Sequence, residues 1–250
     1  MSVILRILTG WFWPALLMLS MAGNAVADVA LTPYTAEYKV KISILSGKLL
    51  TEFRRTDAGY MAKSVIEPQG LASIFVHGTI EESAWFDTIT GSVVPERYHS
   101  VDTITEDRKV MDFEFDWGHH EITGKIDDQD YTIPLDGPVH DRVSIQYELM
   151  YDLLNKGPSE HYVLLNDEEL RPIVVTNIGR KKVKVPFGEF EAVGIQHHTE
   201  DSSRVSTLWC VEELGYIPVI IEQHRDGKLR VRAVLKHYTP IIETAAAPAR

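Results

Sequence analysis

Two stretches of this sequence share one pattern: LWCVEELGYIPV at Leu208–Val219 and AWFDTITGSVVPE at Ala84–Glu96. Each places a Trp in a β-like run, then a polar turn with Gly, then a Pro just inside the next run. Proline donates no hydrogen bond to a sheet, so it is tolerated only at a strand start, an edge or a bulge. Used twice, the pattern predicts a sheet that bends twice in the same sense, as a half-barrel or barrel. The alternative is that Trp, turn and Pro recur by chance in a β-rich chain.

Alternation of apolar and polar side chains with a period of two dominates the rest of the chain. Residues 34–42 show it most clearly, and this pattern is typical of a half-buried strand. Strands on both sides of one long helix, without βαβ alternation, predict a mainly β fold with an antiparallel sheet. We expect one β-rich domain at residues 28–239 and a disordered tail at residues 240–250. The expected strands are 34–42, 49–53, 60–66, 81–87, 94–101, 109–117, 121–126, 131–135, 161–165, 173–178, 182–185, 190–198, 205–211, 217–224 and 229–238.

The segment DRVSIQYELMYDLLN at residues 141–155 has the spacing of an amphipathic helix. Val143, Tyr147 and Met150 fall on one helical face. A helix of this length is marginal in water on its own, so we expect it to pack centrally on the concave face of the sheet. A weaker helical pattern lies at residues 70–75.

The first 27 residues have the features of a secretory signal peptide. Arg6 precedes an apolar run, and the small residues Ala25 and Ala27 follow it. We therefore expect export across the inner membrane to the periplasm and cleavage after Ala27, although an uncleaved membrane anchor is the alternative. No other segment is long and apolar enough to cross a membrane as a helix, so the mature chain is expected to have no transmembrane span.

Charge and cysteine content limit the classes of function. The formal net charge is −11, which argues against nucleic acid as a partner because that affinity depends on cations that neutralise phosphates. Cys210 is the single cysteine, so an internal disulfide is impossible and core packing must stabilise the chain.

Three stretches carry a resemblance to a known family: HDRVSIQYELMYDLL, KVKVPFGEFEAVGIQ and TLWCVEELGYIPVIIEQHRDGKLRVRAVL. Together they resemble the domain-of-unknown-function 3108 family of exported bacterial proteins. This resemblance implies a protein of the cell envelope, a helix opened by Asp141-Arg142 and a hairpin turn at residues 186–188. It implies no activity, catalytic residue or cofactor. At the level of fold alone, the strand pattern is also similar to periplasmic lipoprotein carriers, whose half-barrel holds acyl chains.

No motif in the chain indicates catalysis or a resident cofactor. The adjacent pairs His119-His120 and His197-His198 cannot chelate one ion from an extended strand, because neighbouring side chains point to opposite faces. The strained Gly-x-Ser-x-Gly elbow of many hydrolases is missing. We therefore predict no catalytic residue, no metal site and no cofactor, and keep a hydrolase or metal enzyme with scattered residues as a minor alternative.

The sequence thus predicts a non-enzymatic binding or accessory protein of the envelope with an apolar ligand such as a lipid. Arg142 lies in the first turn of the helix, where the helix dipole disfavours a cation. It would either bind a ligand headgroup or lock the helix to the sheet by pairing with Asp141, with Glu148 or with a sheet acid such as Glu222. An interaction scaffold for an envelope assembly, without a cavity, is the main alternative. The expected apolar contacts, which an ordinary core would equally use, are Tyr38, Phe53, Trp85, Tyr147, Met150 and Trp209.

Overall fold

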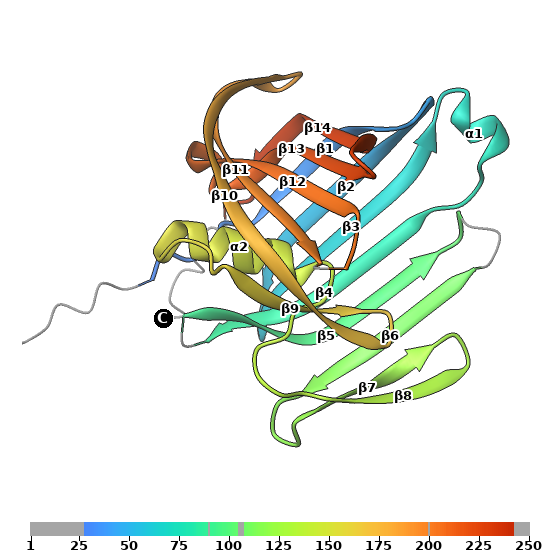
Figure 1. Ribbon diagram of the computed structural model, residues 1–250, viewed down its shortest axis with the longest axis vertical. Coiled ribbons are helices and arrows are strands. Elements are labelled where there is room, and N and C mark those ends of the chain that lie inside the picture. Colours follow the sequence, from blue (N-terminus) through green and yellow to red (C-terminus); the bar gives the residue numbers. More distant parts are fainter. Residues whose placement is uncertain (1–27, 90, 105–107, 200, 243–250) are drawn as a thin grey trace, which may run out of the picture.

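The computed structural model describes residues 28–89, 91–104, 108–199 and 201–242, which form a mainly β structure (Figure 1). The expected signal peptide at residues 1–27, and residues 243–250 of the expected tail, lie outside this part of the chain. The elements before the long helix are β1 (Tyr34–Ile42), β2 (Leu45–Thr56), β3 (Gly59–Gln69), α1 (Ala72–Phe75), β4 (Ile80–Ile89), β5 (Ser92–Asp102), β6 (Lys109–Asp116), β7 (Glu121–Ile126) and β8 (Gln129–Pro134). The long helix α2 (Ser144–Asn155) is followed by β9 (His161–Asn166), β10 (Glu169–Val185), β11 (Gly188–Thr199), β12 (Arg204–Val211), the 3-10 turn η1 (Glu212–Leu214), β13 (Ile217–Arg225) and β14 (Lys228–Pro240).

The 14 strands in the described residues belong to one sheet, in the order β8-β7-β6-β5-β4-β3-β2-β1-β14-β13-β12-β11-β10-β9. Every pair of neighbouring strands is antiparallel, as expected from the sequence. The pairing of β1 with β14 places the first and last described strands side by side in mid-sheet. In the described residues the order ends at β8 and β9, so the pairing does not close the sheet into the barrel that was one of the two predicted forms.

Both Trp-turn-Pro stretches form hairpins with a β-bulge next to the Trp. In the β4–β5 pair the register shifts between Trp85 and Phe86, where Pro95 is the partner of Phe86. In the β12–β13 pair it shifts between Trp209 and Cys210, where Pro218 is the partner of Cys210. A bulge leaves one residue of the longer strand unpaired and increases the local twist. The repeated sequence pattern therefore does correspond to a repeated structural device.

Helix α2 lies against the face of the sheet formed by β4 and β5. Asp141 caps its first turn: Oδ1 of Asp141 accepts hydrogen bonds from the backbone N–H groups of Val143 and Ser144 at 2.8 and 2.9 Å. Glu148 ties the helix to the start of β5, because its carboxylate accepts the backbone N–H of Val93 at 2.6 Å. The helix is thus held by polar contacts as well as by its apolar face.

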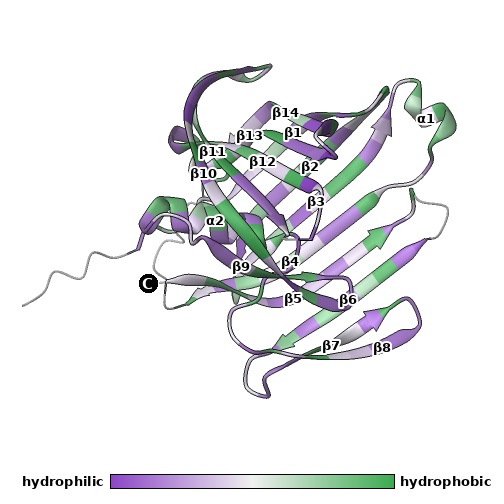
Figure 2. Ribbon diagram, in the orientation of Figure 1, coloured by the Kyte–Doolittle hydropathy of each residue, from purple (hydrophilic) through white to green (hydrophobic). Residues whose placement is uncertain are grey.

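The core follows the alternation in the sequence, which Figure 2 shows as bands of hydrophobic and hydrophilic residues along the strands. A cluster of aromatic rings fills the space between α2 and β1–β5. The ring of Tyr147 lies 4.5 Å from Phe53 and 5.2 Å from Phe86 between centroids. Burying such rings stabilises the fold through both apolar area and ring packing.

Some boundaries differ from the sequence-based expectation. Residues 173–178 and 182–185 are parts of one strand, β10, because a register shift between Asn177 and Arg180 absorbs the intervening Gly179. Strand β14 continues through Pro240, and the backbone N–H of Ile241 donates to the carbonyl of Pro33 at 2.9 Å. Neither helix in the described part of the chain has the length and apolar character that spanning a bilayer requires.

Candidate functional site: a cavity with an arginine pair

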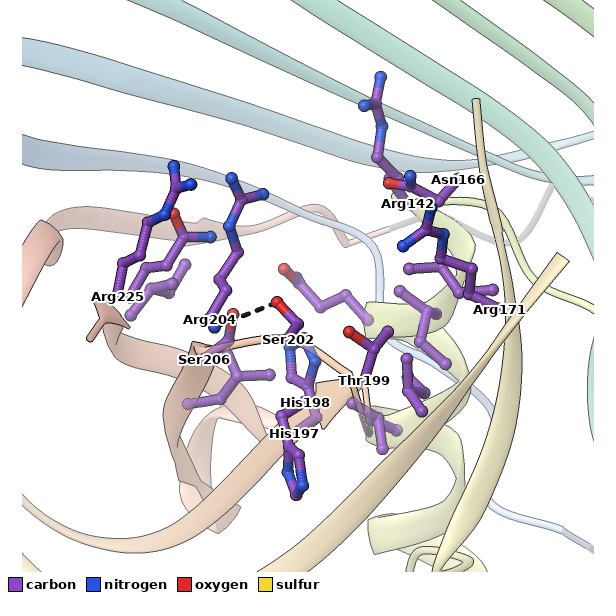
Figure 3. Close-up of a pocket in the computed structure, with 18 of the residues that line it drawn as sticks. Arg142, Asn166, Arg171, His197, His198, Thr199, Ser202, Arg204, Ser206 and Arg225 are labelled. Carbon is purple, nitrogen blue, oxygen red and sulfur yellow. Dashed lines mark hydrogen bonds between the residues drawn. The ribbon is translucent and has the colours of Figure 1, made fainter. Parts of the chain in front are cut away.

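A cavity of about 610 Å³ lies between helix α2 and the strands β9 to β13 (Figure 3). Its volume falls within the range of small-molecule sites, which is roughly 300–1,000 Å³. The lining combines an apolar part with a group of cationic side chains. The apolar part is Ile145, Leu149, Leu164, Ile173, Leu208 and Ile221, and the cations are Arg142, Arg171, Arg204 and Arg225.

Three pairs of facing residues on β12 and β13 build one wall of the cavity. Leu208 is the register partner of Ile221, Ser206 of Gln223, and Arg204 of Arg225. Residues two apart on a strand share a face, so all six side chains belong to the same face, and all six line the cavity. The wall therefore changes along the strands from apolar, through neutral polar, to cationic.

Histidine 197 adds a neutral polar group to this wall. It lies on β11 as the register partner of Ser206. Burial lowers the pKa of His197 to about 4, with a smaller contribution from His198. Its ring is therefore uncharged at neutral pH, and the positive charge of the cavity comes from the arginines.

Arg142 lines the cavity, but its charge is already neutralised. Its guanidinium lies 3.0 Å from a carboxylate oxygen of Glu82 and 3.9 Å from one of Asp167. It also donates two hydrogen bonds to the hydroxyl of Tyr98, at 3.0 and 2.9 Å. Of the two roles considered for Arg142, these contacts support the one in which it fastens the start of α2 to β4 and β5. The acids are not those considered for that role (Asp141, Glu148 or Glu222), because the helix meets the sheet at Glu82 and the β9–β10 turn.

Four of the apolar residues predicted to contact a ligand belong to the core beside the cavity. Tyr38, Phe53, Tyr147 and Met150 each expose 2% or less of their surface. None of them lines the cavity. They fill the space between α2 and the first strands, which agrees with the core reading of these residues.

The two predicted tryptophans lie on the other face of the sheet. Trp85 stands between Ala84 and Phe86, which are fully buried on the helix side, and the Arg97 guanidinium covers its ring at 5.4 Å. Trp209 alternates with the cavity residue Leu208, and the Lys181 ammonium lies 3.6 Å from its ring. A cationic side chain therefore covers each indole.

Arg204 and Arg225 were not predicted from the sequence as site residues. The signal in the sequence was an arginine two residues from a neutral polar residue, Ser206 or Gln223, and it has no meaning until the register of β12 and β13 is known. The other candidate chemistry is not assembled. In the residues that the structure describes, no group of three His, Cys, Asp or Glu side chains could hold a metal ion.

A model of the family described as "Protein of unknown function (DUF3108)" matches residues 33–233. The chain belongs to the DUF3108 family. The match covers the sheet from its first strand into β14, including α2 and the cavity. A search of curated proteins found no match for this DUF3108 chain.

Solved structures similar to this DUF3108 protein include a beta-barrel-like protein of domain of unknown function DUF1849 from Brucella abortus. That structure has a TM-score of 0.59 and 13% identity, and the match covers 86% of this chain and all of the other. MucB matches with a TM-score of 0.34 and 12% identity over 87% of this chain and 55% of its own. A "putative exported protein" with a YmcC-like fold from Bacteroides fragilis matches with a TM-score of 0.32 and 10% identity. That match covers 85% of this chain and 97% of the other. At these identities the first likeness concerns the fold alone.

Proposed function

We propose that this protein is a non-enzymatic binding or accessory protein of the cell envelope that takes an apolar ligand, such as a lipid chain, into the cavity. The observation that carries the proposal is the apolar part of that cavity, to which α2 contributes Ile145 and Leu149 and the sheet contributes Leu208 and Ile221. Burial of an alkyl chain there would be favourable by about 0.8 kcal/mol for each methylene removed from water.

The arrangement of α2 supports a half-barrel as the form of the binding site. One side of the helix contacts β4 and β5, and another side lines the cavity together with residues of β10 to β13. A sheet that meets one helix from both sides bends around it, and the two hairpin bulges supply local twist for that bend. The apolar run at residues 7–21, with small residues after it, supports export to the periplasm.

A cavity-filling variant tests the proposal. Ser206 lies midway along the cavity wall, so Ser206→Trp would occupy the volume that a ligand needs. The neutral apolar dye N-phenyl-1-naphthylamine serves as the probe in a fluorescence titration. We expect the wild-type chain to bind the dye and Ser206→Trp to bind it at least tenfold more weakly.

Lys182→Trp is the matched control, because Lys182 is exposed on β10 and does not line the cavity. It should bind the dye like the wild type. Native mass spectrometry of protein purified from an envelope fraction gives a second reading, in which the wild type retains a lipid-sized adduct that Ser206→Trp lacks. Equal dye binding by all three chains, with no adduct on the wild type, would refute the proposal.

An interaction scaffold is the second candidate, and a cationic groove on the sheet favours it. Lys39, Lys41, Lys184, Arg230 and Arg232 line this groove, whose volume is about 550 Å³. On a chain with net charge −11, such a groove fits an acidic protein surface. A photo-crosslinker at Lys41 should then give one discrete product in cells that Arg230→Glu abolishes, and no such product would argue against the scaffold.

A further inference from the structure

We propose that the cavity ligand carries an anionic headgroup, a phosphate or carboxylate, held between Arg204 and Arg225. This inference rests on the proposed function, because it concerns the same cavity, and it names the chemical class of the ligand. The site is the arginine pair at the polar end of the cavity wall, where both side chains extend side by side in Figure 3.

The arginine pair has no counter-charge in the described part of the chain. Neither guanidinium lies within 4.0 Å of a described carboxylate. Among the described residues that line the cavity, one carboxylate is present, that of Asp201, and it forms no ion pair with either arginine. The other two arginines of the cavity differ: Arg142 is paired with Glu82, and Arg171 with Glu169 at 2.5 Å.

Their register places the two like charges directly opposite each other. Arg204 begins β12 and Arg225 ends β13, and the two are partners in the antiparallel ladder. Like charges at such positions destabilise a sheet, and the hairpin gains nothing from them on its own. An anion between the two guanidiniums would turn this repulsion into two charge-assisted contacts, and the planar guanidinium suits the oxygens of phosphate and carboxylate.

The position of the pair specifies an amphiphile and not a free anion. The same wall continues from the arginine pair through Ser206 and Gln223 to Leu208 and Ile221. A molecule with a charged head and an alkyl tail would match this sequence of surfaces from one end to the other. The side chains of Ser206 and Gln223, in the middle of the wall, can both form hydrogen bonds. They would suit the ester or hydroxyl oxygens that link a headgroup to its tail.

Calorimetric titration with three related probes tests the inference. The probes are 1-myristoyl lysophosphatidic acid, 1-myristoylglycerol, which lacks the phosphate, and glycerol 3-phosphate, which lacks the tail. We expect the first to bind at least tenfold more tightly than either of the others. Arg204→Gln and Arg225→Gln should each weaken binding of the first probe about ten- to hundredfold, as expected for the loss of a hydrogen-bonded charge contact, and leave binding of 1-myristoylglycerol unchanged.

Arg54→Gln is the control, because Arg54 is an exposed arginine on β2 that lines neither the cavity nor the cationic groove. Its binding of all probes should equal that of the wild type.

If both myristoyl compounds bind with equal affinity and the two cavity variants change the binding of neither, the headgroup inference fails while the apolar site stands. If glycerol 3-phosphate binds as tightly as the lysophosphatidic acid, the amphiphile inference fails. If no myristoyl compound binds, the proposed function itself fails. Far-UV circular dichroism checks that each variant is folded.

Discussion

At the scale of single residues, burial shifts the pKa values of two neighbours just before α2 in opposite directions. Burial lowers the pKa of His140 from 6.5 to about 4 and raises that of Asp141 from 3.8 to about 6. Between about pH 4 and 6.5, the unfolded chain binds a proton at His140 that the folded chain does not. The contribution of His140 to the free energy of unfolding is therefore fully present above pH 6.5 and is lost as the pH falls to about 4. Stability from Asp141 is present below pH 3.8 and is lost as the pH rises to about 6.

The variant His140→Phe separates these two contributions. We expect the wild type to lose more stability than His140→Phe between pH 7 and pH 5, by up to about 1.4 kcal/mol per pH unit for one proton. Urea denaturation at a series of pH values measures the difference. His119→Gln is the control, because His119 is exposed and Asp116 raises its pKa. This variant should therefore not reduce the loss of stability between pH 7 and pH 5. Parallel curves for wild type and His140→Phe would contradict the assignment.

At the scale of elements, the packing of Trp209 depends on a glycine in the neighbouring strand. Gly194 on β11 is the register partner of Trp209. A Cβ at Gly194 would lie 2.6 Å from the Ile178 side chain and 2.8 Å from the indole of Trp209. Because an indole ring is rigid and Trp209 exposes only 7% of its surface, the indole cannot move aside without loss of packing.

We therefore expect Gly194→Ala to lower the free energy of unfolding by about 1–3 kcal/mol, as overpacking does. Chemical denaturation gives this value, and the near-ultraviolet circular dichroism of tryptophan should change at the same time. Gly118→Ala is the matched control, since the nearest atom to its Cβ would be a carboxylate oxygen of Asp116 at 3.4 Å. Equal stability of the two variants would show that the indole tolerates a methyl group.

At the scale of the whole molecule, the pairing of β1 with β14 makes the first and last strands parts of one ladder. Every described strand except β8 and β9 has neighbours on both sides. Separation of any inner strand would break its hydrogen bonds to both neighbouring strands and expose core residues. We therefore expect one cooperative unfolding transition. Cys210 on β12 reports on it, because the thiol is buried and burial raises its pKa to about 12.

Labelling of Cys210 with a disulfide reagent should therefore occur at the rate of global unfolding. We expect this rate to match the one from far-UV circular dichroism across a series of denaturant concentrations. Lys182→Cys, which adds an exposed thiol, should be labelled at that site without unfolding. Fast labelling of Cys210 in the native state would reveal local opening of β12.

The sequence by itself determined most of the strands, the residues that form α2, the antiparallel pairing and the two hairpins with a Pro, because each follows from local periodicity or from the missing N–H of proline. It did not determine the cavity wall. Counted from Val211 and Ile217 without a bulge, Arg204 would face His224. The bulge at Trp209 and Cys210 moves the register by one residue, and Arg204 faces Arg225. Such a shift depends on how the hairpin packs in the full sheet, and a shift of one residue reverses which side chains share a face, so only the tertiary structure brought the two arginines together.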